Sequence, residues 1–529
     1  MTGHRDPAAD VGSARRSRRV WRRNSLTVVA TTALILSTVA WAGAESRTSA
    51  EPRGDHVARP TVEGPIEGGM HGFPFGASAM PLSALGYVED EFFVSGTAHA
   101  YGSDEPLSAD GRWNVKPVAE APYRTRLLVR RPRDASHFNG VVIVEWLNVS
   151  SGYDIQGTWS FSHEHLLREG YAYVGVSAQE VGVNGFPPGN PAGNAGALKV
   201  WDPERYGRLQ HPGDSFSYDI FSQAAMALLH GAPTRARPVR PLGHLRIKRL
   251  VAAGTSQSAI RLNTYINAVH PLADVYDGFL VQVGFGRGAP LTQAPLDDLQ
   301  APIPTLLRTD LDDPVMDIET ETEILGGAFA ARQPDTPRLR RWEIAGGAHG
   351  NRYNLAVLAA DATRAVPSPP LPASDLRVFD TCAKPLNEGP QQYVYNAAVE
   401  AMTGWLLDGV PAPSAPLLEV KTGPPLSLML DDVGNARGGV RSTLLDVPTA
   451  IYSGVGNTGP CAGLLGSTVF LDGNSLHALY GSHQDYVAKV SDAAARLVRE
   501  RFLVPEDAVH LIAQAGQSRV GLTTPAPAA

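Results

Sequence analysis

The chain has 529 residues, of which 43% are hydrophobic and 19% are charged, with a formal net charge of -7 at pH 7. This balance is ordinary for a packed globular protein and excludes a long disordered or low-complexity chain. Outside the first 44 residues the sequence has no block of lysines and arginines, so we expect neither nucleic acid nor an anionic lipid surface as a partner. A small molecule is the expected partner.

Residues 1–44 have the layout of an export signal. Six arginines between positions 15 and 23 precede an apolar stretch that ends in Ala42-Gly43-Ala44, a small-residue cleavage pattern. We place the cleavage before Glu45, with a permanently inserted anchor as the alternative. Arg22-Arg23 resembles a twin-arginine signal, although Ser25 stands where that signal prefers a large apolar residue. Cleavage removes seven arginines and two aspartates, which changes the net charge from -7 to -12. We expect an exported protein, secreted or held in the cell envelope, with no stable membrane insertion after signal removal.

From position 87 onward, apolar runs of strand length alternate with amphipathic stretches of helix length, a pattern typical of a mostly parallel sheet flanked by helices. Residues 92–101 and 123–130 are expected to pair first, as antiparallel strands, because no helical stretch separates them. Further expected strands are 140–146, 171–177, 245–253, 277–284, 314–320 and 339–345, and expected helices are 154–168, 215–229, 393–407 and 486–502.

The domain organisation predicted from this pattern is an α/β core at 45–411 and a carboxyl-terminal extension at 412–529 packed on that core. Residues 181–208 are rich in glycine and proline and are long for a structureless connection, so we expect them to cover part of a site. Residues 366–372 are expected to form a stiff spacer after the last strand.

The candidate nucleophile is Ser256, in Gly254-Thr-Ser-Gln-Ser258. A strand that turns sharply into a helix at Gly-x-Ser presents the serine hydroxyl above the sheet edge, and small flanking residues are required because strand and helix pass close together. The general fingerprint ends in glycine, whereas this one ends in Ser258. The alternative is that Ser256 is an ordinary N-cap residue of the helix.

Two further segments supply partners in the order nucleophile, acid, histidine that this kind of site requires. Residues 314–320 are followed by two carboxylates, Glu321 and Glu323, and we choose Glu323 as the acid because it lies beyond the strand, on the loop. Glu321 is the alternative acid, and a solvated acidic loop is the structural alternative for both. His349 follows the last strand in a glycine-rich turn and is the expected general base.

The negative charge that develops on the substrate needs backbone donors. One is expected from Gln257, directly after the nucleophile, and the second from the segment 147–149, represented by Asn148. Asn148 also begins an Asn-Val-Ser glycosylation sequon, which a bacterial-type export signal makes irrelevant.

These motifs resemble a family of secreted or cell-envelope α/β-hydrolase proteins of bacteria whose elbow is Gly-x-Ser-Gln-Ser-Ala. The resemblance extends over most of residues 70–510 and includes Val144-Glu-Trp-Leu-Asn-Val-Ser150, Gly254–Ala259, Thr320-Glu-Thr-Glu323 and Trp342-Glu-Ile-Ala-Gly346 with His349. Ser258 fits the pattern of this family, whereas the family usually has aspartate as the acid where this chain has Glu323. The resemblance implies the α/β-hydrolase fold and carboxylic ester hydrolysis, and it names no substrate.

Other signals predict no metal and no cofactor. His163-Glu164-His165 lacks the His-Glu-x-x-His spacing and is expected on the surface. Residues 310–314 begin like a calcium loop, but Pro314 takes a ligand position. Gly284-Phe-Gly-Arg-Gly288 follows a strand without dinucleotide-binding spacing. The two cysteines, Cys382 and Cys461, are expected to form one disulfide in an exported protein, with two buried thiols as the alternative.

The function predicted from the sequence is a cofactor-free secreted serine esterase that forms an acyl-enzyme on Ser256 and acts on a small-molecule ester. One alternative uses the same three residues for acyl transfer to another alcohol or for amide cleavage. The other is a non-catalytic envelope binding protein on the same fold, motivated by the departures at Ser258 and Glu323.

Overall fold

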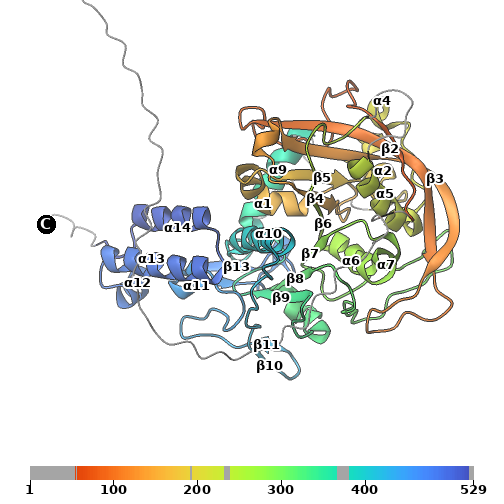
Figure 1. Cartoon of the computed structure of the whole chain (residues 1–529). Helices are drawn as coiled ribbons and strands as arrows, with labels where there is room; N and C mark the ends of the chain where they lie inside the picture. Colours follow the sequence, from red (N-terminus) through yellow and green to blue (C-terminus); the bar gives the residue numbers. More distant parts are fainter. Residues whose placement is uncertain (1–53, 55, 191–192, 231–238, 366–379, 523–529) are drawn as a thin grey trace, which may run out of the picture. The chain divides into compact units, whose positions relative to one another are not determined.

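Nine strands form the central sheet of the computed structural model, which describes residue 54 and residues 56–190, 193–230, 239–365 and 380–522 (Figure 1). Their order across the sheet is β1-β2-β3-β5-β4-β6-β7-β8-β9. The strands are β1 Thr61–Glu63, β2 Tyr87–Gly102, β3 Lys116–Pro132, β4 Val141–Trp146, β5 Ala172–Val176, β6 Arg249–Thr255, β7 Gly278–Gln282, β8 Val315–Thr320 and β9 Leu339–Ile344. The expectations on the export signal and on the spacer 366–372 concern residues outside this description.

The sheet is antiparallel at one edge and parallel elsewhere. β1, β2, β3 and β5 pair antiparallel, whereas β5, β4, β6, β7, β8 and β9 pair parallel. The predicted opening pair is confirmed as β2 and β3. Every residue of β4 is buried, as expected for a parallel strand that is covered on both faces. All carboxyl ends of the parallel strands therefore lie at one edge of the sheet.

Helices cover both faces of the sheet, which confirms the α/β architecture (Figure 1). Val141 and Ile143 pack with α1 (Gly157–Arg168) and α10 (Gln391–Asp408) on one face. Val142 and Val144, which alternate with them, pack on the other face with α5 (Ser217–His230), α6 (Gln257–Thr264), the π-helix η3 (Tyr265–Val269) and α7 (His270–Ala273). The period of two along the strand sends successive side chains to opposite cores.

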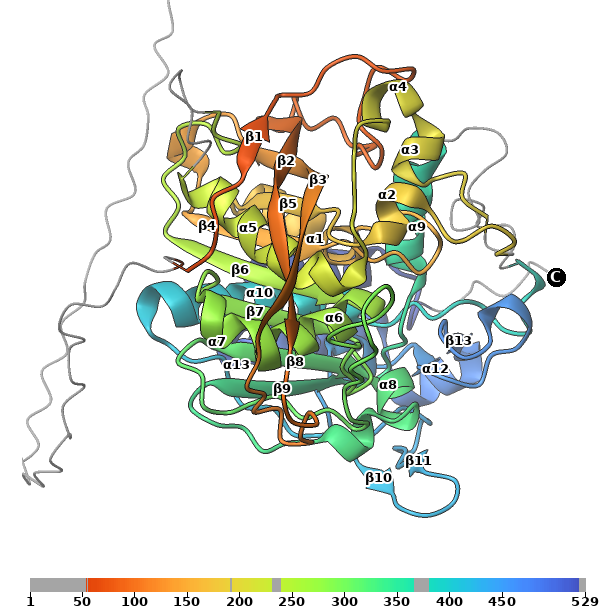
Figure 2. The same cartoon turned by 90° about the vertical axis from the view of Figure 1, so that its right-hand side faces the viewer.

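The segment 181–208 contains three short helices, α2 (Glu180–Asn184), α3 (Leu198–Trp201) and α4 (Pro203–Tyr206). They share a hydrophobic cluster with Ala362 of α9 (Arg352–Ala365), a helix that the sequence analysis missed (Figure 2). The segment also packs against the loop after β4, because a Cβ on Gly152 would lie 2.7 Å from Gly193 O and 3.0 Å from the Phe186 ring. It therefore lies beside a loop that follows a parallel strand, where ligands of such sheets bind.

The carboxyl-terminal region adds two small hairpins and several helices. The hairpins are β10 (Val420–Lys421) with β11 (Ser427–Leu428) and β12 (Ala450–Ser453) with β13 (Ser467–Phe470), and the helices are α11 (Thr443–Asp446), α12 (Gly473–Leu479), α13 (His483–Glu500) and α14 (Pro505–Gln517). The helix predicted at 486–502 is present as α13, but it is not the last helix as expected, because α14 begins anew at Pro505, which fits the first position of a helix. The division at residue 411 stays a prediction.

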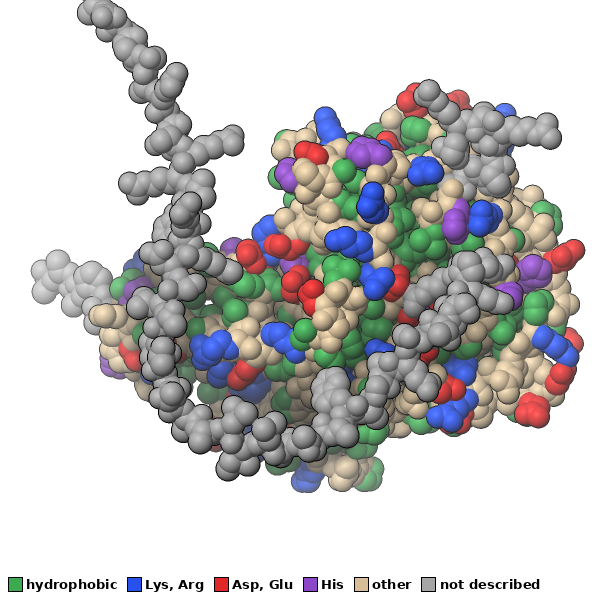
Figure 3. Space-filling model, viewed as in Figure 1, with side chains coloured by type: hydrophobic (Ala, Val, Ile, Leu, Met, Phe, Trp, Pro, Cys, Tyr) green, Lys and Arg blue, Asp and Glu red, His purple; other side chains and the backbone are tan. Residues whose placement is uncertain are grey.

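A disulfide joins Cys382 to Cys461, as expected. None of the helices that the structure describes has both the length and the apolar composition of a bilayer span. On the face in Figure 3, basic and acidic side chains are interspersed rather than gathered by sign.

Candidate active site

Ser256 stands alone between a strand and a helix. β6 ends at Thr255 and α6 begins at Gln257, so Ser256 makes the whole turn, with φ 62° and ψ -123°. A Cβ on Gly254 would lie 2.8 Å from Ser258 O, which shows how closely strand and helix approach. The Ser256 hydroxyl makes no capping hydrogen bond to the helix, so the N-cap alternative does not describe it. Its side chain is free to face the end of the sheet.

The structure brings the three predicted residues into one hydrogen-bonded row. His349 Nε2 lies 2.8 Å from Ser256 Oγ, and His349 Nδ1 lies 2.7 Å from Glu323 Oε1. Glu323 is fully buried, and 13% of the His349 side chain is exposed. A buried carboxylate at Nδ1 keeps the proton on that nitrogen, so Nε2 is left to accept from the serine hydroxyl.

Glu323 lies in a helix rather than on the predicted loop. α8 (Glu321–Leu325) begins directly after β8, and Thr320 and Glu323 form a capping box. Thr320 N–H donates to Glu323 Oε2 at 3.0 Å, and the Thr320 hydroxyl donates to the same oxygen. Oε1 is thereby left for His349. The Thr-x-x-Glu pattern was the sequence signal that could have predicted this helix start.

Glu321, the alternative acid, is also buried but points elsewhere. Its two oxygens accept from Gly346 N–H (2.6 Å) and Gly454 N–H (2.7 Å), and burial raises its pKa from 4.5 to about 7. Gly346 begins the turn that carries His349, and Gly454 follows β12. Glu321 therefore links that turn to the carboxyl-terminal region, and it does not contact the imidazole. The solvated acidic loop is excluded for both carboxylates.

Of the two residues expected to donate to a developing oxyanion, Gln257 has a backbone amide that is free within the described chain, whereas that of Asn148 is not. Gln257 is the first residue of α6, where a backbone N–H has no acceptor within the helix. Asn148 is not available, since its backbone N–H donates to Ile155 O and its Nδ2 donates to Thr255 O, both at 3.0 Å. Leu147 N–H donates to Val176 O. Val149 is the remaining amide of the segment, with only a long contact of 3.4 Å to Gln257 Oε1.

Several residues that sequence reasoning missed hold the His349 turn. The holding residues come from distant segments. Two of them accept from backbone amides of the turn: Thr322 Oγ1 accepts from His349 N–H (3.1 Å), and Leu464 O accepts from Gly350 N–H (3.1 Å). Two others donate to backbone carbonyls of the turn: Gln391 Nε2 donates to Ala348 O (2.7 Å), and Asn387 Nδ2 donates to Gly346 O (2.9 Å). Leu464 is three residues after the disulfide-bonded Cys461. No local pattern marks these contacts, because each joins segments far apart in the chain.

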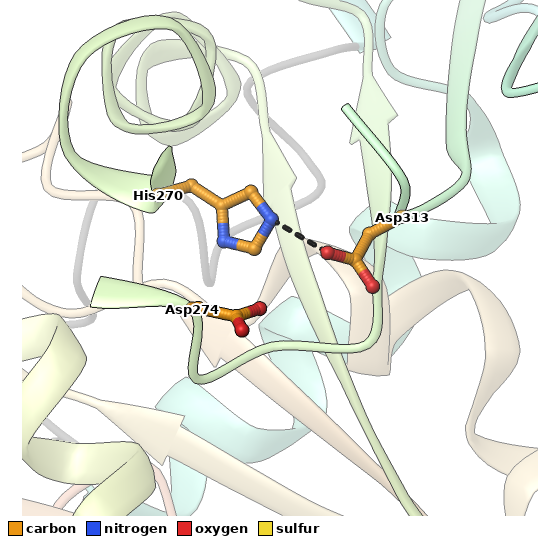
Figure 4. Close-up of side chains that lie close together, drawn as sticks. All are labelled: His270, Asp274 and Asp313. Carbon is orange, nitrogen blue, oxygen red and sulfur yellow. Dashed lines mark hydrogen bonds and ion pairs between the residues drawn. The ribbon is translucent and has the colours of Figure 1, made fainter. Parts of the chain in front are cut away.

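One group of side chains among the described residues could surround an ion. His270, Asp274 and Asp313 offer ligand atoms within 4.8 Å of one another, and His270 Nε2 lies 3.0 Å from Asp313 Oδ2 (Figure 4). Asp313 precedes β8 whereas Glu323 follows it, so a strand of about 20 Å separates this group from His349. His270 Nδ1 is buried without a hydrogen-bond partner in the described chain, whereas a metal-bound imidazole donates from its second nitrogen. The geometry is that of a buried hydrogen bond between an imidazole and a carboxylate.

The prediction that His163 and His165 lie on the surface was wrong. Their exposed fractions are 4% and 1%. α1 packs against the sheet and contacts both α10 and α9, so residues on several sides of the helix are covered. Burial lowers the pKa of both histidines, and His165 falls to about 3. Both are therefore neutral packing residues, and neither belongs to the group that could surround an ion.

Residues 62–513 match the model of a family described as an alpha/beta hydrolase domain. No curated protein matches the chain. The similar solved structures include the glucuronoyl esterase from Solibacter usitatus, with 11% identity, 56% of this chain and 82% of that chain covered, and a TM-score of 0.25. They also include oligopeptidase B from Leishmania major, with 10% identity, 53% of this chain and 36% of that chain covered, and a TM-score of 0.26. A third is acetyl xylan esterase 1 from Thermoanaerobacterium sp. JW/SL YS485, with 10% identity, 54% of this chain and 81% of that chain covered, and a TM-score of 0.26.

Proposed function

The chain belongs to the alpha/beta hydrolase domain family, and from that premise we propose that it is a serine hydrolase that cleaves carboxylic esters through an acyl-enzyme on Ser256. The observation that carries the proposal is the imidazole of His349, which lies between the Ser256 hydroxyl and the buried Glu323 carboxylate. A serine hydroxyl is a weak nucleophile unless an adjacent base takes its proton.

The first half-reaction transfers the acyl group to the protein. Ser256 Oγ attacks the ester carbonyl carbon while its proton passes to His349 Nε2, giving a tetrahedral intermediate with a negative oxygen. The bond to the leaving alkoxide then breaks, and the imidazolium returns the proton to that oxygen, so an alcohol departs. Glu323 stabilises the imidazolium and keeps its orientation throughout.

The second half-reaction repeats these steps with water. His349 takes a proton from water as the water oxygen attacks the acyl carbon, and the imidazolium then protonates Ser256 Oγ as the acyl bond breaks. The products are the carboxylic acid and the free serine. In both halves we assign the oxyanion donors to Gln257 N–H and Val149 N–H, in place of Asn148.

A fluorophosphonate probe tests the proposal without a known substrate. The activated Ser256 should displace fluoride from phosphorus, and peptide mass spectrometry should locate the adduct on Ser256. Ser256→Ala should abolish labelling, whereas the matched variant Ser150→Ala, which removes an exposed hydroxyl in the loop after β4, should label at the wild-type rate. Labelling that persists in Ser256→Ala would disprove the proposal.

Export is proposed separately, because it rests on residues 1–44 and on the disulfide between Cys382 and Cys461. A disulfide is stable in oxidising compartments outside the cytosol. Expression of the full chain in a bacterium should yield a mature protein that begins at Glu45 outside the cytoplasm. Replacing Arg22 and Arg23 by lysine should stop export if the twin-arginine route is used, and export should continue if the general route is used.

A further inference from the structure

The segment after β7, which matched no cofactor motif, has an unusual backbone. Val283 and Phe285 adopt φ values of 52° and 59°, on either side of Gly284. Left-handed backbone is unfavourable for β-branched and bulky residues because Cβ crowds the following carbonyl. Such conformations persist only where the surroundings enforce them, and they concentrate at active sites. The strain therefore marks this turn as a place to look for function.

The turn is held from several sides. Three hydrogen bonds fix its backbone to two other segments, β8 and the loop that contains Thr305: Val283 N–H donates to Ile318 O (2.8 Å), Gly286 N–H donates to Glu319 Oε1 (3.3 Å) and Thr305 N–H donates to Gly286 O (2.9 Å). A Cβ on Gly286 would lie 2.3 Å from the Ala331 Cβ, so no larger residue fits there. The backbone on both sides of Phe285 is thus fixed, and this leaves its side chain little choice of direction.

The Phe285 ring points at the proposed general base. Its centroid lies 5.3 Å from that of the His349 imidazole, and the two planes meet at 34°. Another part of the ring lies against Gly326, the residue that ends α8, where a Cβ would be 2.9 Å from the Phe285 Cε1 atom. One ring therefore contacts both the imidazole and the end of the short helix that carries Glu323.

We infer that Phe285 is a positioning residue for His349, an inference that rests on the proposed function. Its ring limits the rotation of the imidazole away from the line between Ser256 and Glu323. It also favours the imidazolium that forms when Ser256 loses its proton, because the face of an aromatic ring attracts a cation within about 6 Å. The backbone strain at 283 and 285 is what places the ring there.

The test uses the second-order rate of fluorophosphonate labelling, measured from about pH 5 to about pH 9, which reports the titration of His349 without a known substrate. Phe285→Leu and Phe285→Ala should lower the plateau rate about tenfold or more. They should also shift the acid limb to lower pH, because the imidazolium loses its aromatic neighbour. Phe285→Tyr keeps a ring and should stay within about threefold of wild type, with an unshifted limb.

Phe285→Gly is the matched control for strain. It removes the same ring contact as Phe285→Ala but suits a positive φ, so it should melt several degrees higher than the alanine variant while labelling equally slowly. If the alanine variant does not fold, the labelling rates and acid limbs of the leucine and tyrosine variants test the inference.

Two outcomes would overturn the inference. One is labelling of Phe285→Leu at the wild-type rate, and the other is a lowered plateau with no shift of the acid limb, which a merely structural role would give. Both leave the adduct on Ser256, so the proposed function would stand. Wild-type protein that is not labelled at Ser256 would instead remove the proposed function, and with it this inference.

Discussion

The Ser256 turn and the His349 turn present two partners of one hydrogen bond, but they are built differently. The first is held by its neighbours in sequence and by adjacent strands of the sheet: Ser258 Oγ bonds the amide and carbonyl of Thr255 (2.9 and 3.0 Å), and Ser256 N–H donates to Gln282 O of β7 (2.9 Å). The side chain of Asn148, just after β4, donates to Thr255 O (3.0 Å). The second is held by side chains and carbonyls from α8, α10, the segment before α10 and the loop after the second cysteine. The turn of the proposed nucleophile thus needs only the core of the sheet, whereas the turn of the proposed base also depends on the folded carboxyl-terminal region.

The largest expected effect comes from removing the Ser256 hydroxyl. Ser256→Ala should lower the ester hydrolysis rate by about 10⁶-fold, because no other group among the three can form the acyl bond. The measurement is kcat on p-nitrophenyl acetate. Since the hydroxyl makes no structural cap, the melting temperature should stay unchanged. A large fall in melting temperature would show that Ser256 also supports the turn.

Glu323→Gln should come next, with a fall in kcat of about 10⁴-fold. The neutral amide cannot stabilise imidazolium, and it can present its NH₂ group to Nδ1, which favours the wrong tautomer. Glu323→Asp, which restores the residue usual in the resembled family, keeps the charge but shortens the reach, so it should retain more activity than the glutamine variant. Equal activity of the two variants would contradict a role for the charge.

Removing the disulfide should act mainly on the His349 side. It joins residues 79 apart, and the closed loop of that size corresponds to about 4 kcal/mol of stability in the chain-entropy model. The double variant Cys382→Ser/Cys461→Ser should unfold at lower denaturant. Below that transition it should lose ester hydrolysis, because Leu464 O holds Gly350. Full activity after reduction of the wild type would show that the His349 turn is independent of this loop.

The smallest expected effect is the pH dependence from Glu321. Burial raises its pKa from 4.5 to about 7, so the folded protein binds more protons than the unfolded chain between these values. The contribution of Glu321 to the free energy of unfolding is fully present below pH 4.5 and is lost as the pH rises through 7. By linkage this change amounts to about 3 kcal/mol. Denaturant unfolding of Glu321→Gln at several pH values should show a flatter dependence than wild type.

Glu145 provides the matched control for that experiment. Burial raises its pKa to about 7 as well, but it accepts from Thr158 N–H (2.8 Å) and Trp159 N–H (3.2 Å) at the start of α1, away from the His349 turn. Glu145→Gln should flatten the stability curve to a similar extent. Only Glu321→Gln should also reduce ester hydrolysis, and an equal reduction in both variants would refute a specific link between Glu321 and His349.

Much of the fold could be predicted because strands and long helices leave local patterns. The alternation of β and α segments, the opening antiparallel pair and the turn at Ser256 all follow from residues close in sequence. α8 has only five residues, too few for a helical period, although its capping box is a local signal. α14 begins with Pro505, a residue type that ends a helix as readily as it starts one. His163 and His165 were misplaced because the sequence does not show that α9 and α10 cover α1.

The sequence by itself determined the order of Ser256, a carboxylate and His349, since each follows a strand and parallel strands end at one edge of a sheet. Only the tertiary structure decided which carboxylate faces the imidazole, because Glu321 and Glu323 differ in what lies opposite them rather than in their own neighbours. The same holds for the hydrogen bonds that occupy Asn148 and leave Val149 N–H with only a long one, and for the contact of the Phe285 ring with His349. Hydrogen-bond partners and ring contacts from distant segments set these choices, and a local pattern carries no record of them.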